Sequence, residues 1–513
     1  MKLKYLILAV LVSAGMLAAP ALKAATLQVG IGTSDISNLD VHRATGFDSM
    51  LLNHVFNGLV RFPPGTADPG KLEPDLAESW EESPDHNTWT FHLRKGVQFH
   101  HGYGELHADD IVYSLTRAAD VKRSSQAATF EAIEKIEAVD PYTVRITLKR
   151  PVPGFLGLVA NYRGGNITSK KAGEALNDNF GARPIGTGPF QVEEHVPQQY
   201  VKLKAHAAYF RGKPKIDEVF WRFVVSDSSR DLAFKAGQLD LIYGRREQRW
   251  VDSVRQRKGV VLDIFGPGEF RTLHLNRSIK PLDDLRVRQA IAHAVNVDEI
   301  VQFVGKDIAK KGCSVVPPGY LGEDCSFTYN YDPALAKRLL AESGHPDGIT
   351  IPVVVSNISS QLPIMEVIQN QLGKAGIVLD MKVVDHPTYH EQIRKDASAI
   401  VFYGAARFPV ADTYLTQFYD SAATVGKTTA ITNFSHCSVG DEAIRAARVE
   451  PDPAKQLEYW KKAQEQINHD VCGVPLFDLR QVWAHSDKLD YGYEFHGDIN
   501  IAPPITERTT INK

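Results

Sequence analysis

The spacing of hydrophobic positions changes repeatedly along the chain and predicts a mixed α/β protein. Alternating apolar and polar residues predict a strand in "ATLQVGIGT", at 25–33. Apolar residues spaced by three and four predict helices at 47–62, 107–120 and 283–304. The order strand, helix, strand at 349–385 is typical of a parallel α/β unit.

From Leu72 onward the pattern becomes mainly that of strands, with "TWTFHL" at 88–93 and two alternating runs separated by the turn "DPYT" at 140–143. The Gly/Pro-rich segment "GARPIGTGPF", at 181–190, ends this region. A chain of 513 residues is too long for one compact core. We therefore expect a mixed α/β lobe with a β-rich insertion, a large α/β lobe after it, and a cleft for a ligand between the lobes.

The composition is that of an ordinary soluble protein and argues against two classes of partner. Hydrophobic residues make up 43 % of the chain and charged residues 23 %, as in ordinary soluble proteins. The formal net charge is -3 and no block of like charge occurs. Nucleic acids and anionic membrane surfaces favour a basic face, so neither is expected as a partner.

The first residues have the three-part pattern of a secretory signal peptide. Two lysines precede an apolar run and then small residues in "MKLKYLILAVLVSAGMLAAPALKA". The pattern predicts a signal peptide at 1–24 with cleavage after Ala24, although the small residues of 19–21 also fit a cleavage site. No cysteine lies nearby to carry a lipid. We therefore expect an exported, soluble protein, located in the periplasm of a two-membrane bacterium.

Four cysteines lie in the second half of the chain. Export favours disulfides over a zinc site, which remains the alternative. The Pro/Gly-rich loop "CSVVPPGYLGEDC" predicts a bridge between Cys313 and Cys325. Cys437 and Cys472 are then left as a possible second pair.

Sequence signatures of catalysis are missing. The chain contains no H-E-x-x-H, G-x-S-x-G, phosphate-binding P-loop or C-x-x-C sequence. His386 and His390 have helical i,i+4 spacing but no evident third ligand, and His92 alternates with apolar neighbours on a predicted strand. His100 and His101, adjacent at a predicted strand end, should face opposite ways. We therefore expect no metal, no cofactor and no enzymatic activity.

Several motifs resemble those of the family 5 extracellular solute-binding proteins, the dipeptide/oligopeptide-binding class of ABC importers. The matching stretches follow in family order and include "TWTFHLRKGVQFHHG", "GTGPFQV", "AGQLDLI", "KPLDDLRVRQAIAHAVNVDEIV" and "VPPGYLG". The family usually carries Asp-Gly where His101-Gly102 stands here. The resemblance implies that the histidine-containing hairpin is a structural part of a small lobe.

This resemblance implies a periplasmic-binding-protein clamshell of type II, class C-like, with an extra inserted domain. Domain I would comprise 25–60, 185–269 and 485–513, the β-rich inserted domain II 61–184, and domain III 270–484. A small solute or short peptide would be buried between domains I and III. Closure of the lobes around it would present a monomer to the subunits of a membrane ABC permease. We expect the connections between the lobes near 202–205 and 270–276.

The resemblance also places the ligand loop at "VFYGAARFPVADTYL", 401–415. Peptide-binding members carry an Asp in this loop that pairs with the free amine of the peptide. Ala405 stands at that position here. A buried ammonium without its carboxylate is destabilised by several kcal/mol, so this difference argues against an ordinary peptide amine.

Nearby residues offer other ligand chemistry. Arg407, with Arg271 on a strand next to the expected hinge, would suit a carboxylate or a phosphate. Tyr403 belongs to the same loop. Alternatively, Arg407 is solvated and Asp412 pairs with an amine.

Three hypotheses remain open on the sequence. The ligand is of the dipeptide/oligopeptide class, as the family favours. It is instead an anionic small molecule such as an opine, a polycarboxylate or a metal chelate, as Ala405 and Arg407 favour. In a third, more distant hypothesis, the chain is an exported hydrolase that uses its histidines.

Overall fold

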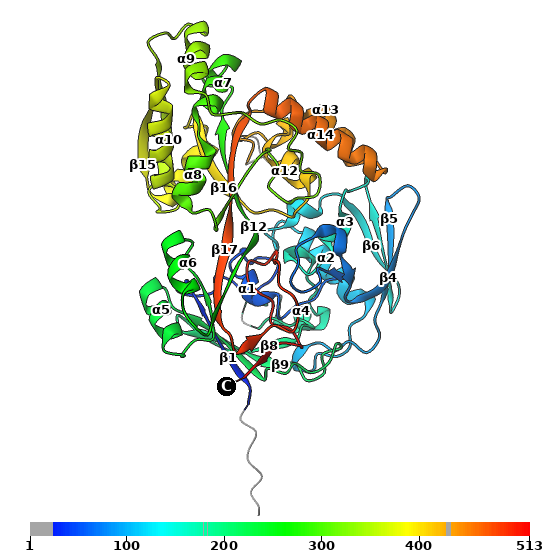
Figure 1. The fold of residues 1–513 in the computed structure, drawn as a ribbon. Helices are drawn as coiled ribbons and strands as arrows, with labels where there is room; N and C mark the ends of the chain where they lie inside the picture. Colours follow the sequence, from blue (N-terminus) through cyan, green and yellow to red (C-terminus); the bar gives the residue numbers. More distant parts are fainter. Residues whose placement is uncertain (1–23, 178, 182, 427–431, 513) are drawn as a thin grey trace, which may run out of the picture.

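The computed structural model describes residues 24–177, 179–181, 183–426 and 432–512 (Figure 1). The predicted signal peptide, up to residue 23, lies outside the described residues. Within the described part of the chain, no helix is both long and apolar enough to cross a membrane.

A nine-stranded sheet connects the lower and upper parts of the molecule in Figure 1. Its strand order is β16-β12-β17-β11-β1-β10-β9-β8, and β13 pairs with β17 in addition. Strand β1 is parallel to both of its neighbours, and the other pairings are antiparallel. The strands are β1 (Thr26–Ile31), β8 (Phe190–Val196), β9 (Tyr200–Ala205), β10 (Glu218–Phe223), β11 (Leu241–Tyr243), β12 (Val260–Leu275), β13 (Ala309–Lys311), β16 (Ile400–Ala405) and β17 (Gly473–Ser486).

Two long strands, β12 and β17, run between the lower and the upper lobe (Figure 1). They pair from Val260 with Ser486 to His274 with Gly473, with irregularities between Phe265 and Glu269 and between Arg271 and Thr272. The connection predicted at 270–276 thus falls within β12. The connection predicted at 202–205 is wrong, because this segment belongs to β9, which pairs only with β8 and β10 on the far side of the sheet.

A separate four-stranded sheet, in the order β4-β5-β7-β6, lies within the range expected for the inserted domain. Its strands are β4 (Ala77–Glu82), β5 (Thr88–Leu93), β6 (Ile133–Asp140) and β7 (Thr143–Leu148). In β5, Trp89, Phe91 and Leu93 are buried, whereas the residues between them are partly exposed. One face of the strand therefore packs on the core, as the alternation predicts. Helices α2 (Ala108–Ala119), α3 (Phe155–Leu158) and α4 (Lys170–Leu176) complete this region.

The remaining strands form three two-stranded sheets in the described part of the chain. In the upper lobe, β14 (Ile349–Ser356) and β15 (Ile377–Val384) are parallel and flank α10 (Leu362–Lys374) in sequence, as predicted. The short pair β2 (Val60–Arg61) and β3 (Glu73–Pro74), and the pair β18 (Leu489–Asp490) and β19 (Thr510–Ile511), lie outside the large sheets. The other α-helices are α1 (Ser49–Leu52), α5 (Asp227–Lys235), α6 (Gln248–Arg255), α7 (Leu285–Ala294), α8 (Val297–Val304), α9 (Pro333–Glu342), α11 (His386–Arg394), α12 (Ala411–Phe418), α13 (Asp441–Val449) and α14 (Pro453–His469).

Two predicted helices are shorter than expected. The helix predicted at 47–62 is only α1, because the carbonyls of His54 and Val55 accept hydrogen bonds from the distant backbone of Phe190 and Gly188. The helix predicted at 283–304 is divided into α7 and α8. The division occurs where the side chain of Asn296 caps α8 by accepting a hydrogen bond from a backbone N–H.

The histidine run is built into the fold. His100 and His101 form a short 3₁₀ turn with Gly102, so the prediction that they end a strand is wrong. His100 is fully buried, and its Nε2 lies 3.0 Å from the carbonyl oxygen of Gly188. Burial lowers the pKa of His100 to about 3, so its ring is neutral and helps to pack the domain.

Both disulfides are present. Cys313 is bonded to Cys325 and Cys437 to Cys472, with Cα–Cα distances of 5.3 and 5.7 Å. The first pair, with Glu323, forms the one group in the described part of the chain with the proximity that a metal site needs. Because the two sulfurs are bonded to each other, they are not thiolate ligands here.

Candidate functional site

A cluster of three charged side chains lies where β12 passes from one lobe to the other. Glu269 accepts a hydrogen bond from Arg246 at 2.9 Å and another from Arg271 at 2.6 Å. Glu269 and Arg271 are two residues apart on β12 and so project from the same side of the strand. Arg246 comes from the loop between β11 and α6 in the lower lobe. The cluster therefore joins the lower lobe to the strand that leads into the upper one.

The electrostatics of this cluster favour an anion. Although burial acts to raise it, the pKa of Glu269 falls to about 2, because Arg271 and Arg246 flank the carboxylate. Two guanidinium groups and one carboxylate leave a net positive charge. The Nε of Arg271 is buried and has no hydrogen-bond partner among the described residues. Since Glu269 is one-third exposed, the cluster is reachable from solvent.

A glycine makes room for one of these guanidiniums. Gly404 pairs with Arg271 in the register of β16 and β12. A Cβ atom at Gly404 would lie only 2.4 Å from Nη1 of Arg271. Any larger residue at this position would displace the guanidinium, so the loop sequence and the charge cluster depend on each other.

A second carboxylate lies beside the cluster on β17. Asp478 is buried and accepts hydrogen bonds from the backbone N–H of Gly268, at 3.1 and 3.2 Å. Burial raises the pKa of Asp478 to about 6, and the charge of Glu269 adds to this effect. At neutral pH most of this carboxyl group is therefore ionised and offsets part of the positive charge of the cluster, and it takes up a proton only slightly below neutral pH.

The loop that follows β16 is held to the upper lobe through Tyr320. The hydroxyl of Tyr320 donates to the carbonyl of Arg407 at 2.7 Å and accepts from its backbone N–H at 3.2 Å. The Arg407 side chain donates from Nε to Gln417, and its guanidinium lies 5.3 Å from the ring centre of Phe418. Arg407 is thus well ordered by its own lobe. Asp478 and Tyr162 also act electrostatically on Tyr320, which places the loop near the charge cluster and the inserted domain.

The structure brings some of the predicted site residues together and separates one. Ala405 and Tyr403 on β16 pair with Phe270 and Thr272 of β12, on either side of Arg271. Ala405 is buried, and its carbonyl accepts a hydrogen bond from Tyr414 at 2.6 Å.

Asp412 lies elsewhere, on α12. Its carboxylate is 3.6 Å from Arg448, and Arg150 of the inserted domain acts on it electrostatically. Burial raises the pKa of Asp412 to about 6. Asp412 therefore faces the boundary between the upper lobe and the inserted domain, away from the Arg246–Glu269–Arg271 cluster.

The predicted histidine pair does meet on α11. The Nε2 atoms of His386 and His390 lie 3.1 Å apart, and Nδ1 of His386 lies 2.9 Å from the hydroxyl of Ser356. Burial and the nearby Arg271 lower the pKa of His386. No third ligand joins this pair in the described part of the chain.

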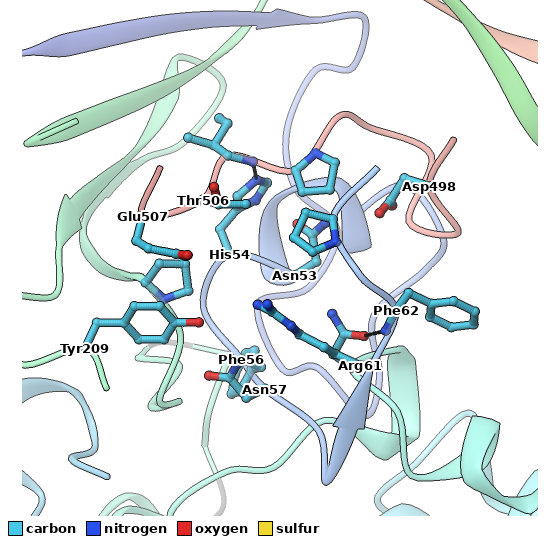
Figure 2. A pocket seen from close by; sticks show the side chains of 15 residues that line it. Asn53, His54, Phe56, Asn57, Arg61, Phe62, Tyr209, Asp498, Thr506 and Glu507 are labelled. Carbon is cyan, nitrogen blue, oxygen red and sulfur yellow. Dashed lines mark hydrogen bonds between the residues drawn. The ribbon is translucent and has the colours of Figure 1, made fainter. Parts of the chain in front are cut away.

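A small polar cavity of about 50 Å³ lies between domain I, which supplies most of its lining residues, and the inserted domain (Figure 2). His54, Arg61, Tyr209 and Asp498 are among its lining residues. Nε2 of His54 accepts a hydrogen bond from the backbone N–H of Ile505 at 2.9 Å. The volume suits one or two waters, far less than a ligand pocket of roughly 300 Å³ or more. This cavity is therefore part of the packing.

Sequence reasoning missed three residues of the charge cluster and its surroundings. Glu269 carried a usable signal, because it precedes Arg271 by two residues, just before the predicted hinge segment at 270–276. Arg246 and Asp478 carried none, since they reach the cluster only through the pairing of β11, β12 and β17.

The chain is similar to known binding proteins over most of its length. Residues 71–425 match the family described as "Bacterial extracellular solute-binding proteins, family 5 Middle". The glutathione-binding protein GsiB of Salmonella choleraesuis (strain SC-B67) is 29 % identical, over 93 % of this chain and 94 % of GsiB.

The chain is also similar to binding proteins of known structure. MoaA of A. tumefaciens R10, in complex with mannopinic acid, is 46 % identical and superposes with a TM-score of 0.84, over 96 % of this chain and 100 % of MoaA. DppA of Helicobacter pylori, in complex with the peptide STSA, is 28 % identical with a TM-score of 0.79, over 95 % and 98 %. The chain belongs to family 5 of the bacterial extracellular solute-binding proteins, which deliver ligands to the permeases of ABC importers.

Proposed function

We propose that this protein captures an anionic solute of the opine-acid type and delivers it to an ABC permease. The observation that carries the proposal is the 46 % identity to MoaA, whose structure holds mannopinic acid, over 96 % of the chain. No other similarity described above is as high. Among the hypotheses from the sequence, the anionic one therefore becomes the leading one.

The charge cluster supports an acid as ligand. Arg246 and Arg271 supply guanidiniums that suit a carboxylate, and Glu269 holds both in place. Ala405 leaves the loop without the carboxylate that would fix a peptide amine. Glu269 offers the one-third exposed carboxylate that a cationic nitrogen on the same ligand would need.

A peptide-type ligand is the second candidate, and Glu269 favours it. Its carboxylate could take the amine-binding role that Ala405 cannot. The glutathione-binding GsiB and the peptide complex of DppA support this candidate at lower identity.

We further propose that the protein acts in the periplasm as a monomer and leaves its ligand chemically unchanged. The signal-peptide pattern of 1–24 supports export, and the lack of catalytic motifs in the sequence supports binding without turnover. The proposal includes no cofactor.

Isothermal titration calorimetry tests the function directly. We expect the mature protein to bind mannopinic acid more tightly than either glutathione or the peptide STSA. Tighter binding of glutathione or STSA would establish the second candidate instead. Recovery of intact ligand after long incubation, with and without a chelator, excludes the hydrolase; a chelator-sensitive loss of ligand would support it.

A further inference from the structure

Phe408 follows Arg407 in the ligand loop and reaches across to the inserted domain. Its ring centre lies 5.7 Å from that of Phe62. The side chain packs against two hydrophobic clusters, one formed by the inserted domain and one by α12, α13 and α14 of the upper lobe. Phe408 is thus a direct apolar link between the two.

A glycine forms the slot that receives this ring. Gly157 lies within α3, where a Cβ atom would come within 2.0 Å of Cζ and 2.5 Å of both Cε atoms of Phe408. Glycine is destabilising in a helix by roughly 1 kcal/mol relative to alanine. A buried helical glycine therefore needs a packing reason, and the ring of Phe408 supplies it.

The loop that carries Phe408 is fixed on the upper-lobe side. Tyr320 holds the backbone of Arg407 through two hydrogen bonds. Next to it, the carbonyl of Pro409 accepts a hydrogen bond from the backbone N–H of Leu321 at 3.0 Å. Because the loop is tied to the upper lobe, Phe408 must leave the Gly157 slot whenever that lobe moves away from the inserted domain.

We propose that Phe408 is a positioning residue for ligand capture, which enters the Gly157 slot only in the closed arrangement of the lobes. This inference rests on the proposed function as a binding protein that closes around its ligand. A contact made only in the closed state raises the fraction of molecules competent to hold ligand tightly. Phe408 therefore increases affinity without touching the ligand, and it fixes the loop that carries Arg407 at the moment of closure.

Substitutions on the two sides of the contact test this proposal. We expect Phe408→Ala and Gly157→Ala each to weaken binding of mannopinic acid by about tenfold or more, mainly through faster dissociation. The matched control is Gly373→Ala, because Gly373 also lies in a helix and a Cβ there would meet nothing within 4 Å. In the double variant the methyl group added at position 157 meets no ring. The double variant should therefore bind no more weakly than Phe408→Ala alone.

A measurement without ligand keeps this test separate from the identity of the ligand. Spin labels at Glu134→Cys, in the inserted domain, and Lys462→Cys, on α14, report the distance between the two regions. Gly157→Ala should shift the ligand-free distances towards longer values, and Gly373→Ala should not.

Each outcome decides between the two claims. Mannopinic acid that fails to bind the wild type overturns the proposed function, while the label distances still judge the slot. If Gly157→Ala and Gly373→Ala have the same affinity and the same label distances, Phe408 does not have the proposed role. The same follows if the losses of affinity from Phe408→Ala and Gly157→Ala add up in the double variant. If Phe408→Ala does not fold, the comparison of Gly157→Ala with Gly373→Ala still gives the answer.

Discussion

Replacement of Arg271 by alanine is the most direct perturbation of the charge cluster. The side chain is only 4 % exposed, donates to Glu269 at 2.6 Å and packs on Gly404. Its loss changes the net charge of the Arg246–Glu269–Arg271 group from positive to neutral. Losing one partner of a buried, hydrogen-bonded charge pair with a ligand typically costs ~2–5 kcal/mol. At 1.4 kcal/mol per tenfold, Arg271→Ala should weaken the binding of mannopinic acid by roughly 30-fold or more.

Calorimetry should be combined with thermal unfolding, because removing a buried arginine also lowers stability. Arg288→Ala is the matched control. Arg288 lies on α7 of the upper lobe, is as buried as Arg271, and pairs with Asp470 at 3.0 Å. Both variants should unfold at lower temperature, but only Arg271→Ala should lose affinity. Arg271→Lys should recover part of the loss, since lysine lacks the planar fork. If Arg271→Ala binds mannopinic acid like the wild type, Arg271 is not the anchor of the ligand. A loss of affinity in Arg407→Ala alone would make Arg407 the anchor.

Three further predictions follow from the structure. Loop-closure entropy predicts that removing the Cys437–Cys472 bridge, which spans 35 residues, lowers the free energy of unfolding by about 4 kcal/mol. Removing the Cys313–Cys325 bridge, which spans 12 residues, should lower the free energy of unfolding by about 3 kcal/mol. Denaturant titration of the two double-serine variants measures both losses, and a larger loss for the shorter bridge would contradict the prediction. Because burial raises the pKa of Asp412 from 3.8 to about 6, the folded state binds this proton more tightly, and its contribution to stability grows as pH falls from about 6 to 4. Unfolding of Asp412→Asn at several pH values should lack this gain, and a parallel pH profile would refute it. Small-angle scattering should show a smaller radius of gyration with saturating mannopinic acid than without it, whereas an unchanged radius despite confirmed binding argues against lobe closure.

Local pattern was sufficient for several elements that pack one face on the core. The alternation of Trp89, Phe91 and Leu93 predicted β5, and the order strand, helix, strand at 349–385 predicted β14, α10 and β15. The same pattern misled at 47–62, because the carbonyls after α1 pair with a segment more than 130 residues away. Such long-range pairing leaves no periodicity in the local sequence.

The candidate site was partly predictable for a similar reason. Ala405, Tyr403 and Arg271 were found through the family resemblance, and β12 and β16 place them side by side. Asp412 was an equally reasonable choice in the sequence, since it lies seven residues after Ala405. The turn of the chain into α12 directs it towards Arg448 instead, which no one-dimensional spacing shows.

Two residues of the charge cluster, Glu269 and Arg271, lie on one of the two strands that join the lobes, so under the proposed function ligand binding and lobe closure would be linked there. The pairing of β12 with β17 is interrupted between Phe265 and Glu269. At this interruption the backbone N–H of Gly268 donates to the Asp478 carboxylate, so a side chain replaces a bond of the strand ladder. A ligand anion on Arg271 would lie immediately beside this interruption, because Glu269 connects the two. If the ligand is an anion bound by Arg271, its charge and the angle between the lobes act on the same few residues, and the proposed contact of Phe408 with Gly157 then stabilises the closed arrangement.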